Sequence, residues 1–217
     1  MNDNNKPTRS FRILSGLCGI IGVLMLIISF NINPGPPQEA SIEQLSSFAH
    51  RFYASILWGA WLQAVGPAFI VVFAFALVKL AGARDQLAGM MTIFGANALM
   101  TVSLMEITMY IGALFEHPQN TGLISLNIIY AIQHLYFIIA APAFFIPLGM
   151  LIIQSKVLHR LFGFSAISLG ILFAGLGIAF LKQLVMPPGV TALAGIQVLW
   201  WISASLGLII KGRKDPF

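Results

Sequence analysis

The chain has 217 residues, of which 58% are hydrophobic and only 9% are charged, and its mean hydropathy is +0.88. In soluble domains about a quarter of the residues are charged, so this composition excludes an ordinary soluble domain and indicates a membrane protein. The net charge of +5 comes from basic residues scattered at the ends of apolar segments. That distribution does not predict a nucleic-acid partner, and the single cysteine, Cys18, excludes an intrachain disulfide.

Six apolar segments follow one another along the chain, at about 13–32, 53–79, 87–115, 122–153, 161–184 and 190–210. Each is near or above the roughly 20 residues that a helix needs to cross the hydrocarbon of a bilayer. The first segment ends without a small-residue cleavage site, so we interpret it as a retained helix and not as a signal peptide. We predict an all-α fold, in which residues 1–217 form one domain with six transmembrane helices.

Local signals mark two further features. Ser41 and Gln44 form a capping-box pattern, which predicts a short interfacial helix before the second span. Pro67 and Pro142 lie inside the second and fourth spans, where each removes an intrahelical hydrogen bond and frees a carbonyl. We expect these prolines to kink their helices. The similar stretches around them, Gly66–Phe69 and Ala141–Phe144, leave a duplication of helix pairs and chance as alternatives.

The lysines and arginines are distributed unequally between the two sides of the predicted bundle. One side carries ten of the twelve, namely Lys6, Arg9, Arg12, Lys79, Arg84, Lys156, Arg160, Lys211, Arg213 and Lys214. The other side carries Arg51 and Lys182. The positive-inside rule therefore predicts an inner (plasma) membrane protein with both termini in the cytoplasm.

Polar side chains of four spans share one layer in the outer half of the bilayer. Gln63, Glu106, His134 and Gln197 lie roughly 11 to 18 Å from the outer ends of their helices, at 1.5 Å per residue. Further polar or aromatic residues lie on the same helix faces at intervals of three, four or seven. The sequence thus predicts a ligand site formed by Gln63, Glu106, Tyr110, Asn127, Tyr130, His134, Gln197 and Trp201.

Glu106 is the most informative member of this layer. An ionised carboxylate facing lipid is unfavourable by several kcal/mol, so Glu106 should face the bundle and either pair with a cation or be protonated. His134 is the only ionisable partner within the spans. We therefore predict that Glu106 and His134 form a coupled pair at the functional centre. Such a pair can also simply lock helices in register.

Other chemistries lack their residues. The remaining histidines, His50, His117 and His159, are at loop positions, so a haem between two histidines within the spans is excluded. There is no zinc-binding set of cysteines and histidines, no Walker loop, no dinucleotide fingerprint and no G-x-S-x-G. We predict neither a metal nor a cofactor.

One stretch reads Ser155-Lys-Val-Leu158-His159-Arg160-Leu-Phe-Gly163 and continues as a glycine-rich run to Gly177. It resembles the serine, leucine, proline, arginine, glycine pattern of an uncharacterised family of bacterial six-helix membrane proteins, a domain of unknown function. His159 stands where that pattern has proline. The resemblance covers about a quarter of the chain. It implies a six-helix bundle and no known activity.

Three functions fit these observations. The first is binding, or proton-coupled transport, of a small amphipathic or cationic ligand at an outward-facing site, with Glu106 as counter-charge or proton carrier. The second is a membrane-embedded enzyme that uses Glu106 as general acid or base on a lipid-soluble, isoprenoid-like substrate, with Trp200 and Trp201 lining the pocket. The third is a structural accessory subunit. The expected partners are the lipid bilayer and a small or lipid-like molecule.

Overall fold

The computed structural model describes residues 9–35, 41–115, 121–182 and 188–214, and all of its regular elements are helices. These are α1 (Arg9–Ile32), α2 (Ile42–Leu80), α3 (Leu87–Phe115), α4 (Thr121–Leu135), the π-helix η2 (Tyr136–Ala140), α5 (Ala141–Ser155), α6 (Arg160–Ala179) and α7 (Pro188–Lys214). Within these ranges six helices are long and apolar enough to cross a membrane, with α4, η2 and α5 contributing to one of them. The predicted all-α class is confirmed, with six helices long and apolar enough to span a membrane.

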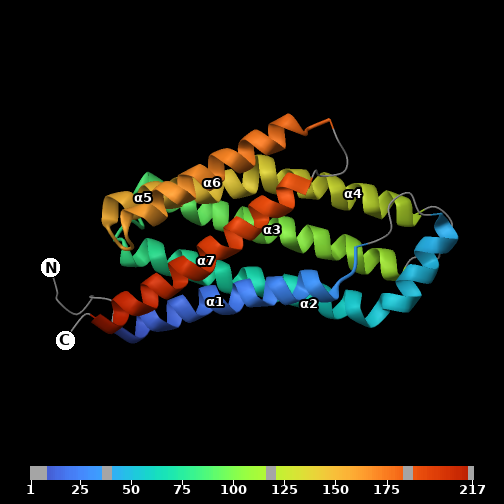
Figure 1. The fold of residues 1–217 in the computed structure, drawn as a ribbon, viewed down its shortest axis with the longest axis horizontal. Coiled ribbons are helices and arrows are strands. Elements are labelled where there is room, and N and C mark those ends of the chain that lie inside the picture. Colours follow the sequence, from blue (N-terminus) through green and yellow to red (C-terminus); the bar gives the residue numbers. More distant parts are fainter. Residues whose placement is uncertain (1–8, 36–40, 116–120, 183–187, 215–217) are drawn as a thin grey trace.

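The helices lie side by side in one elongated bundle (Figure 1). In chain order, α1 packs on α2, α2 on α3, α3 on α4 and α5, and α5 on α6. The last helix, α7, returns along α1 and touches α6 only lightly. As a result α1 begins and α7 ends at the same end of the bundle (Figure 1).

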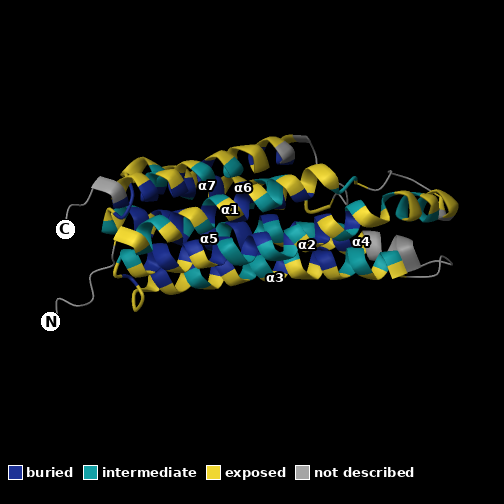
Figure 2. Ribbon diagram, turned by 90° about the horizontal axis from the view of Figure 1, so that it is seen from below, coloured by how far each residue is buried: buried dark blue, intermediate teal, exposed yellow. Residues whose placement is uncertain are grey.

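The surface of the bundle is largely apolar. Exposed residues occur along the outer faces of the helices, and buried residues gather between them (Figure 2). Many of the exposed side chains are large and apolar; Phe94, Ile171 and Leu199 are each more than half exposed. An apolar exterior of this extent is unfavourable in water and suits a multi-pass membrane protein.

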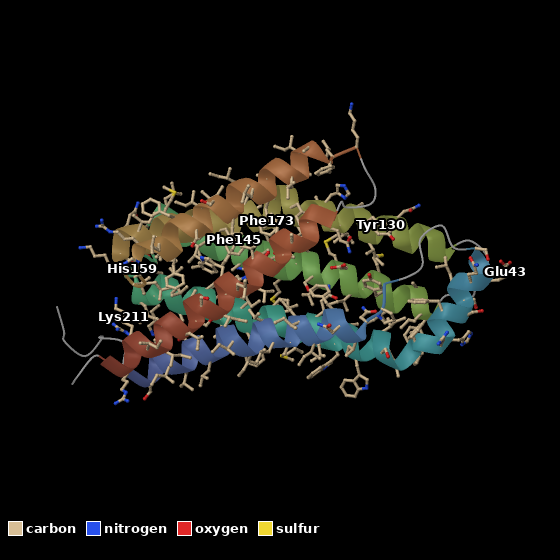
Figure 3. All side chains as sticks on the ribbon, viewed as in Figure 1. Glu43, Tyr130, Phe145, His159, Phe173 and Lys211 are labelled. Carbon is tan, nitrogen blue, oxygen red and sulfur yellow. The ribbon has the colours of Figure 1, made fainter. Side chains whose placement is uncertain are left out.

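Basic residues meet at the end of the bundle that carries the start of α1. Lys211 Nζ donates to the carbonyl of Lys156 at 2.7 Å, and Lys79 Nζ lies 4.8 Å from the centre of the Phe11 ring. Figure 3 shows Lys211 and His159 at this end and Glu43 at the opposite end. Among the described residues, Lys79, Lys156 and Lys211 therefore lie toward this end of the fold.

Close helix crossings depend on glycines that have no room for a side chain. A Cβ on Gly22 would lie 2.7 Å from the Gly66 carbonyl oxygen, and a Cβ on Gly66 would lie 2.9 Å from that of Gly22. A Cβ on Gly95 would collide with the carbonyl oxygen of Ala143. Small residues at such positions let helix backbones approach closely, as is common in membrane bundles. These contacts hold α1 to α2 and α3 to α5.

Aromatic rings fill the centre of the bundle. Trp201 is 2% exposed and stacks on Phe144, with ring centroids 5.1 Å apart. Phe145 contacts Trp200, Trp201 and Phe173, and Figure 3 shows Phe145 and Phe173 in the middle part of the bundle. Large rings add contact area at preferred geometries. This aromatic cluster therefore packs α2, α5, α6 and α7 together.

The start of α2 forms the predicted capping box. Gln44 N–H donates to Ser41 Oγ at 3.3 Å, and Ser41 N–H donates to Gln44 Oε1 at 2.8 Å. Phe52 has non-helical φ and ψ of −109° and 16°, which bend the helix there. The segment before Phe52 is thus the short helix predicted ahead of the second span, and it projects at the end of the bundle away from the termini (Figure 1).

Candidate functional site

The carboxylate of Glu106 is buried between three helices. Glu106 lies on α3 and is 9% exposed. Its Oε2 accepts a hydrogen bond from Gln63 Nε2 of α2 at 2.8 Å, and its Oε1 accepts one from Gln133 Nε2 of α4 at 2.8 Å. Each carboxylate oxygen therefore has an amide donor from a different helix. We refer to Gln63, Glu106 and Gln133 as the carboxylate–amide triad.

Pro67 helps to position the triad through the backbone of α2. In an α-helix the N–H of residue 67 would donate to the carbonyl of residue 63, and proline has no N–H to give. The Gln63 carbonyl instead accepts from Ser103 Oγ of α3 at 2.9 Å. Ser103 lies three residues before Glu106 on the same helix face. The carbonyl freed by Pro67 thus joins α2 to α3 one turn from the carboxylate.

Gln133 was not among the predicted site residues. It directly precedes His134 on α4 and therefore points about 100° away from it around the helix axis. This places Gln133 beside the helix face, formed by Asn127, Tyr130 and His134, that the sequence periodicity indicates. An amide in the middle of an apolar span needs a hydrogen-bond partner, and that need is the only sequence signal that points to Gln133. Its contact with Glu106 is decided by the rotation of α4 about its axis.

His134 is also buried, at 9% exposure. Its Nδ1 lies 2.7 Å from the carbonyl oxygen of Tyr130 on the same helix. Because a carbonyl can only accept, Nδ1 carries the proton in this bond. The two hydrogen bonds described for the Glu106 carboxylate come from Gln63 and Gln133. The predicted pairing of Glu106 with His134 is therefore not among its described hydrogen bonds.

Two tyrosines lie beside the triad. The Tyr110 hydroxyl is close enough to Glu106 and Tyr130 to interact electrostatically with both. Both tyrosines are half-buried, and Figure 3 shows Tyr130 in the half of the bundle away from the termini. Asn127, the third residue of the predicted stripe on α4, is exposed. Thus Gln63 bonds Glu106, Tyr110 lies within electrostatic reach of Glu106 and Tyr130, and Asn127 lies at the surface.

Gln197 and Trp201 belong to a second group of contacts. Gln197 Oε1 accepts from the hydroxyl of Tyr136 at 2.6 Å. Tyr136 also packs edge-on against Phe173, and Trp201 is enclosed in the aromatic cluster. The polar layer that the sequence predicts is therefore divided into two hydrogen-bonded groups, one around Glu106 and one between η2 and α7.

The π-helix η2 begins three residues after Gln133. The Ala141 N–H donates to the Tyr136 carbonyl, five residues earlier, which is the π-helical pattern. Pro142 follows directly, and its ring would clash with the carbonyl four residues before it in a regular α-helix. The wider π turn relieves that crowding. One consequence is that α4 and α5 are separate segments of a single span.

The chemistry available at the triad follows from these contacts. Two neutral amides hold a carboxylate in a fixed orientation, which prepares it to interact with a proton or a positively charged group. Among the described residues, no group of three or more histidine, cysteine, aspartate or glutamate side chains exists that could hold a metal ion. The hydrogen bonds described for Glu106 thus come from neutral amide groups.

Comparisons with known proteins add no family or relative. No protein-family model matches the chain, no curated protein matches it, and no solved structure is similar to it.

Proposed function

We propose that this chain is an integral protein of the inner membrane, with both termini in the cytoplasm, that binds a small amphipathic or cationic ligand at the carboxylate–amide triad. Glu106 is the counter-charge of the ligand, or carries a proton in coupled transport. The observation that carries the proposal is the buried Glu106 carboxylate, whose two described hydrogen bonds both come from neutral amides, at 2.8 Å each.

Charge balance is the physical reason. The amides of Gln63 and Gln133 orient the carboxylate but do not neutralise it, and a charge within the membrane is unfavourable unless it is compensated. The lysines and arginines of the sequence lie near the ends of the spans or in the loops. A positive charge for Glu106 is therefore best supplied by a ligand or a proton. Intramembrane carboxylates with this surrounding are typical of substrate and proton pathways.

A structural role is the second candidate, and one observation favours it. The triad links α2, α3 and α4 through two hydrogen bonds, and Ser103 adds a third between α2 and α3. Interhelical hydrogen bonds of this kind stabilise membrane bundles by about 0.6 kcal/mol each on average. In that case the triad would lock three helices in register without binding anything.

Ligand binding by the purified protein separates the two candidates. The probe is tetraphenylphosphonium, a lipophilic cation, measured by equilibrium dialysis in detergent, with the melting temperature recorded beside it. The variants are Glu106→Gln, which keeps the side-chain volume but cannot ionise, and Glu43→Gln as a matched control. Glu43 is an exposed carboxylate near the start of α2, where loss of charge should leave the triad intact.

We expect saturable binding by the parent and by Glu43→Gln, and an affinity lower by about tenfold or more in folded Glu106→Gln, equivalent to about 1.4 kcal/mol. His134→Gln should retain most of the binding if Glu106 alone supplies the negative charge. Equal affinity of the parent and Glu106→Gln would overturn the proposal. Absence of saturable binding in the parent, combined with a lower melting temperature of Glu106→Gln and equal melting temperatures of the parent in sodium and choline chloride, would establish the structural role instead.

A further inference from the structure

We propose that the carboxylate–amide triad is a binding site for a small alkali cation, of the size of Na⁺, which both glutamines coordinate after their amide groups turn. This inference rests on the proposed function, because it names the ligand of the same site. Turning the amides brings Gln63 Oε1 and Gln133 Oε1 to the positions near which their nitrogens now lie, each beside a different oxygen of Glu106. The ion widens these contacts, because two oxygens that share a cation lie further apart than a hydrogen-bonded nitrogen and oxygen. A cation between them is coordinated by carboxylate and amide oxygens from α2, α3 and α4.

The donor set fits a hard, singly charged ion. Carboxylate and amide oxygens are the ligands that alkali and alkaline-earth cations prefer, whereas zinc and similar metals need histidine or cysteine. Glu106 brings one negative charge, so one monovalent cation leaves the triad neutral. A divalent cation would leave an excess positive charge in the bundle, which is unfavourable.

The amides are able to turn because a side-chain amide carries a donor and an acceptor on one planar group. Rotation by half a turn exchanges Nε2 and Oε1 with almost no change of shape. With no cation bound, the nitrogens face the carboxyl group of Glu106, as in the structure. With a cation bound, the oxygens face the ion. The same three side chains therefore have polar partners in both states: hydrogen bonds to one another without the cation, and the cation itself when it is bound.

Ser103 supplies a fifth oxygen to this region, after the two of Glu106 and one from each glutamine. Its hydroxyl proton is committed to the Gln63 carbonyl at 2.9 Å, so the lone pairs of Oγ remain available as acceptors. Ser103 lies one turn before Glu106 on α3, on the face toward α2. Its bond to Gln63 also fixes the backbone that carries one of the two amide ligands.

Helix irregularities on both sides of the triad support an ion site. Pro67 interrupts the hydrogen bonding of α2 four residues after Gln63, and η2 begins three residues after Gln133. Ion sites of transporters commonly lie near the middle of the bilayer beside interrupted helices. The titratable groups of this region are Tyr110 on α3, which interacts electrostatically with Glu106 and Tyr130, and His134 on α4, whose Nδ1 lies beside the Tyr130 carbonyl.

The thermal stability of the full-length protein in different salts tests the inference. Melting curves are recorded in detergent at mildly alkaline pH with sodium chloride, potassium chloride or choline chloride at one ionic strength. Binding to the folded state alone raises the melting temperature with ligand concentration. We expect a saturable rise of several degrees in sodium chloride over choline chloride, and a weaker effect at lower pH, because protons compete for Glu106.

Two glutamine variants provide the matched comparison. Gln133→Met removes one amide ligand at nearly constant volume, and Gln154→Met makes the same change at an exposed position near the end of α5. We expect at least a tenfold higher sodium concentration at half-maximal stabilisation for Gln133→Met, and the parent value for Gln154→Met. Glu106→Gln should show no difference between sodium and choline.

Equal melting temperatures of the parent in all three salts would overturn the alkali-cation site, and so would an unchanged sodium response in Gln133→Met. If Glu106→Gln nevertheless loses tetraphenylphosphonium binding, the proposed function stands and the alkali cation is the wrong ligand. If Glu106→Gln retains that binding and the sodium response, both proposals fail.

Discussion

The hydrogen bond between Ser103 and the Gln63 carbonyl should depend on Pro67. Ser103→Ala removes the hydroxyl that donates to this carbonyl at 2.9 Å. In the parent no backbone N–H exists at position 67 to take its place. In Pro67→Ala a backbone N–H returns, and it can donate to the carbonyl of residue 63 in the ordinary α-helical pattern. Ser103→Ala should therefore lower the free energy of unfolding by different amounts in the parent and in Pro67→Ala.

The size of the effect follows from burial. Gln63 is 3% exposed, so water does not replace the lost donor. Interhelical hydrogen bonds in membrane proteins contribute about 0.6 kcal/mol on average and up to about 1.7 kcal/mol. We expect Ser103→Ala to lower the free energy of unfolding by about 1 kcal/mol in the parent, and by close to zero in Pro67→Ala. The coupling between the two positions is then about 1 kcal/mol.

The assay is a double-mutant cycle. The parent, both single variants and the double variant are unfolded in mixed micelles with increasing fractions of a denaturing detergent, and the free energies of unfolding are compared. Thr108→Ala on the same helix is the control, because its hydroxyl donates to the Leu104 carbonyl of α3 itself at 2.8 Å. Thr108→Ala should lower the free energy of unfolding by the same amount with and without Pro67.

If Ser103→Ala lowers the free energy of unfolding equally in the parent and in Pro67→Ala, the prediction is wrong, because Pro67 then does not create the need for the serine. A coupling for Thr108→Ala as large as that for Ser103→Ala would refute it as well, because the effect would then be a general consequence of changing α2.

Three further predictions concern the rest of the bundle. Gly95→Ala should destabilise the protein by about 1–3 kcal/mol, because its new Cβ meets the Ala143 backbone. Gly175→Ala should be neutral or slightly stabilising, because nothing lies within 4 Å of the Cβ that it adds. Equal melting temperatures of the two variants would contradict the close α3–α5 contact. Lys211→Met should lower stability by about 1 kcal/mol, because it removes a cation from the carbonyls of Lys156 and Val157, directly after the end of α5. Lys211→Arg should recover part of that loss in the same melting assay. We expect a cytoplasm-specific reporter fused after Phe217 to be active. Activity of a periplasm-specific reporter at the same position would exclude the predicted orientation.

Some properties of this protein are readable from the sequence because they depend on residues close together in the chain. Length and apolarity determine whether a segment can span a bilayer, and the six predicted segments correspond to the six spans of the structure. The capping box is equally local, since Ser41 and Gln44 are three residues apart. The positions of the intramembrane polar residues, and the carbonyl that Pro67 frees, also follow directly from the order of residues.

The partners of those polar residues required the tertiary structure. Neighbouring residues of a helix point about 100° apart, so the rotation of α4 about its axis decides which of its side chains reach the carboxylate of Glu106. The sequence favoured the histidine because it can be charged, and the packing of α3 on α4 brings the amide of Gln133 to within 2.8 Å. In the same way, a freed carbonyl is evident from Pro67 alone, but the donor that satisfies it, Ser103, is 40 residues away in the chain. Periodicity places side chains on faces, and only the close approach of glycine-containing helices determines which faces meet.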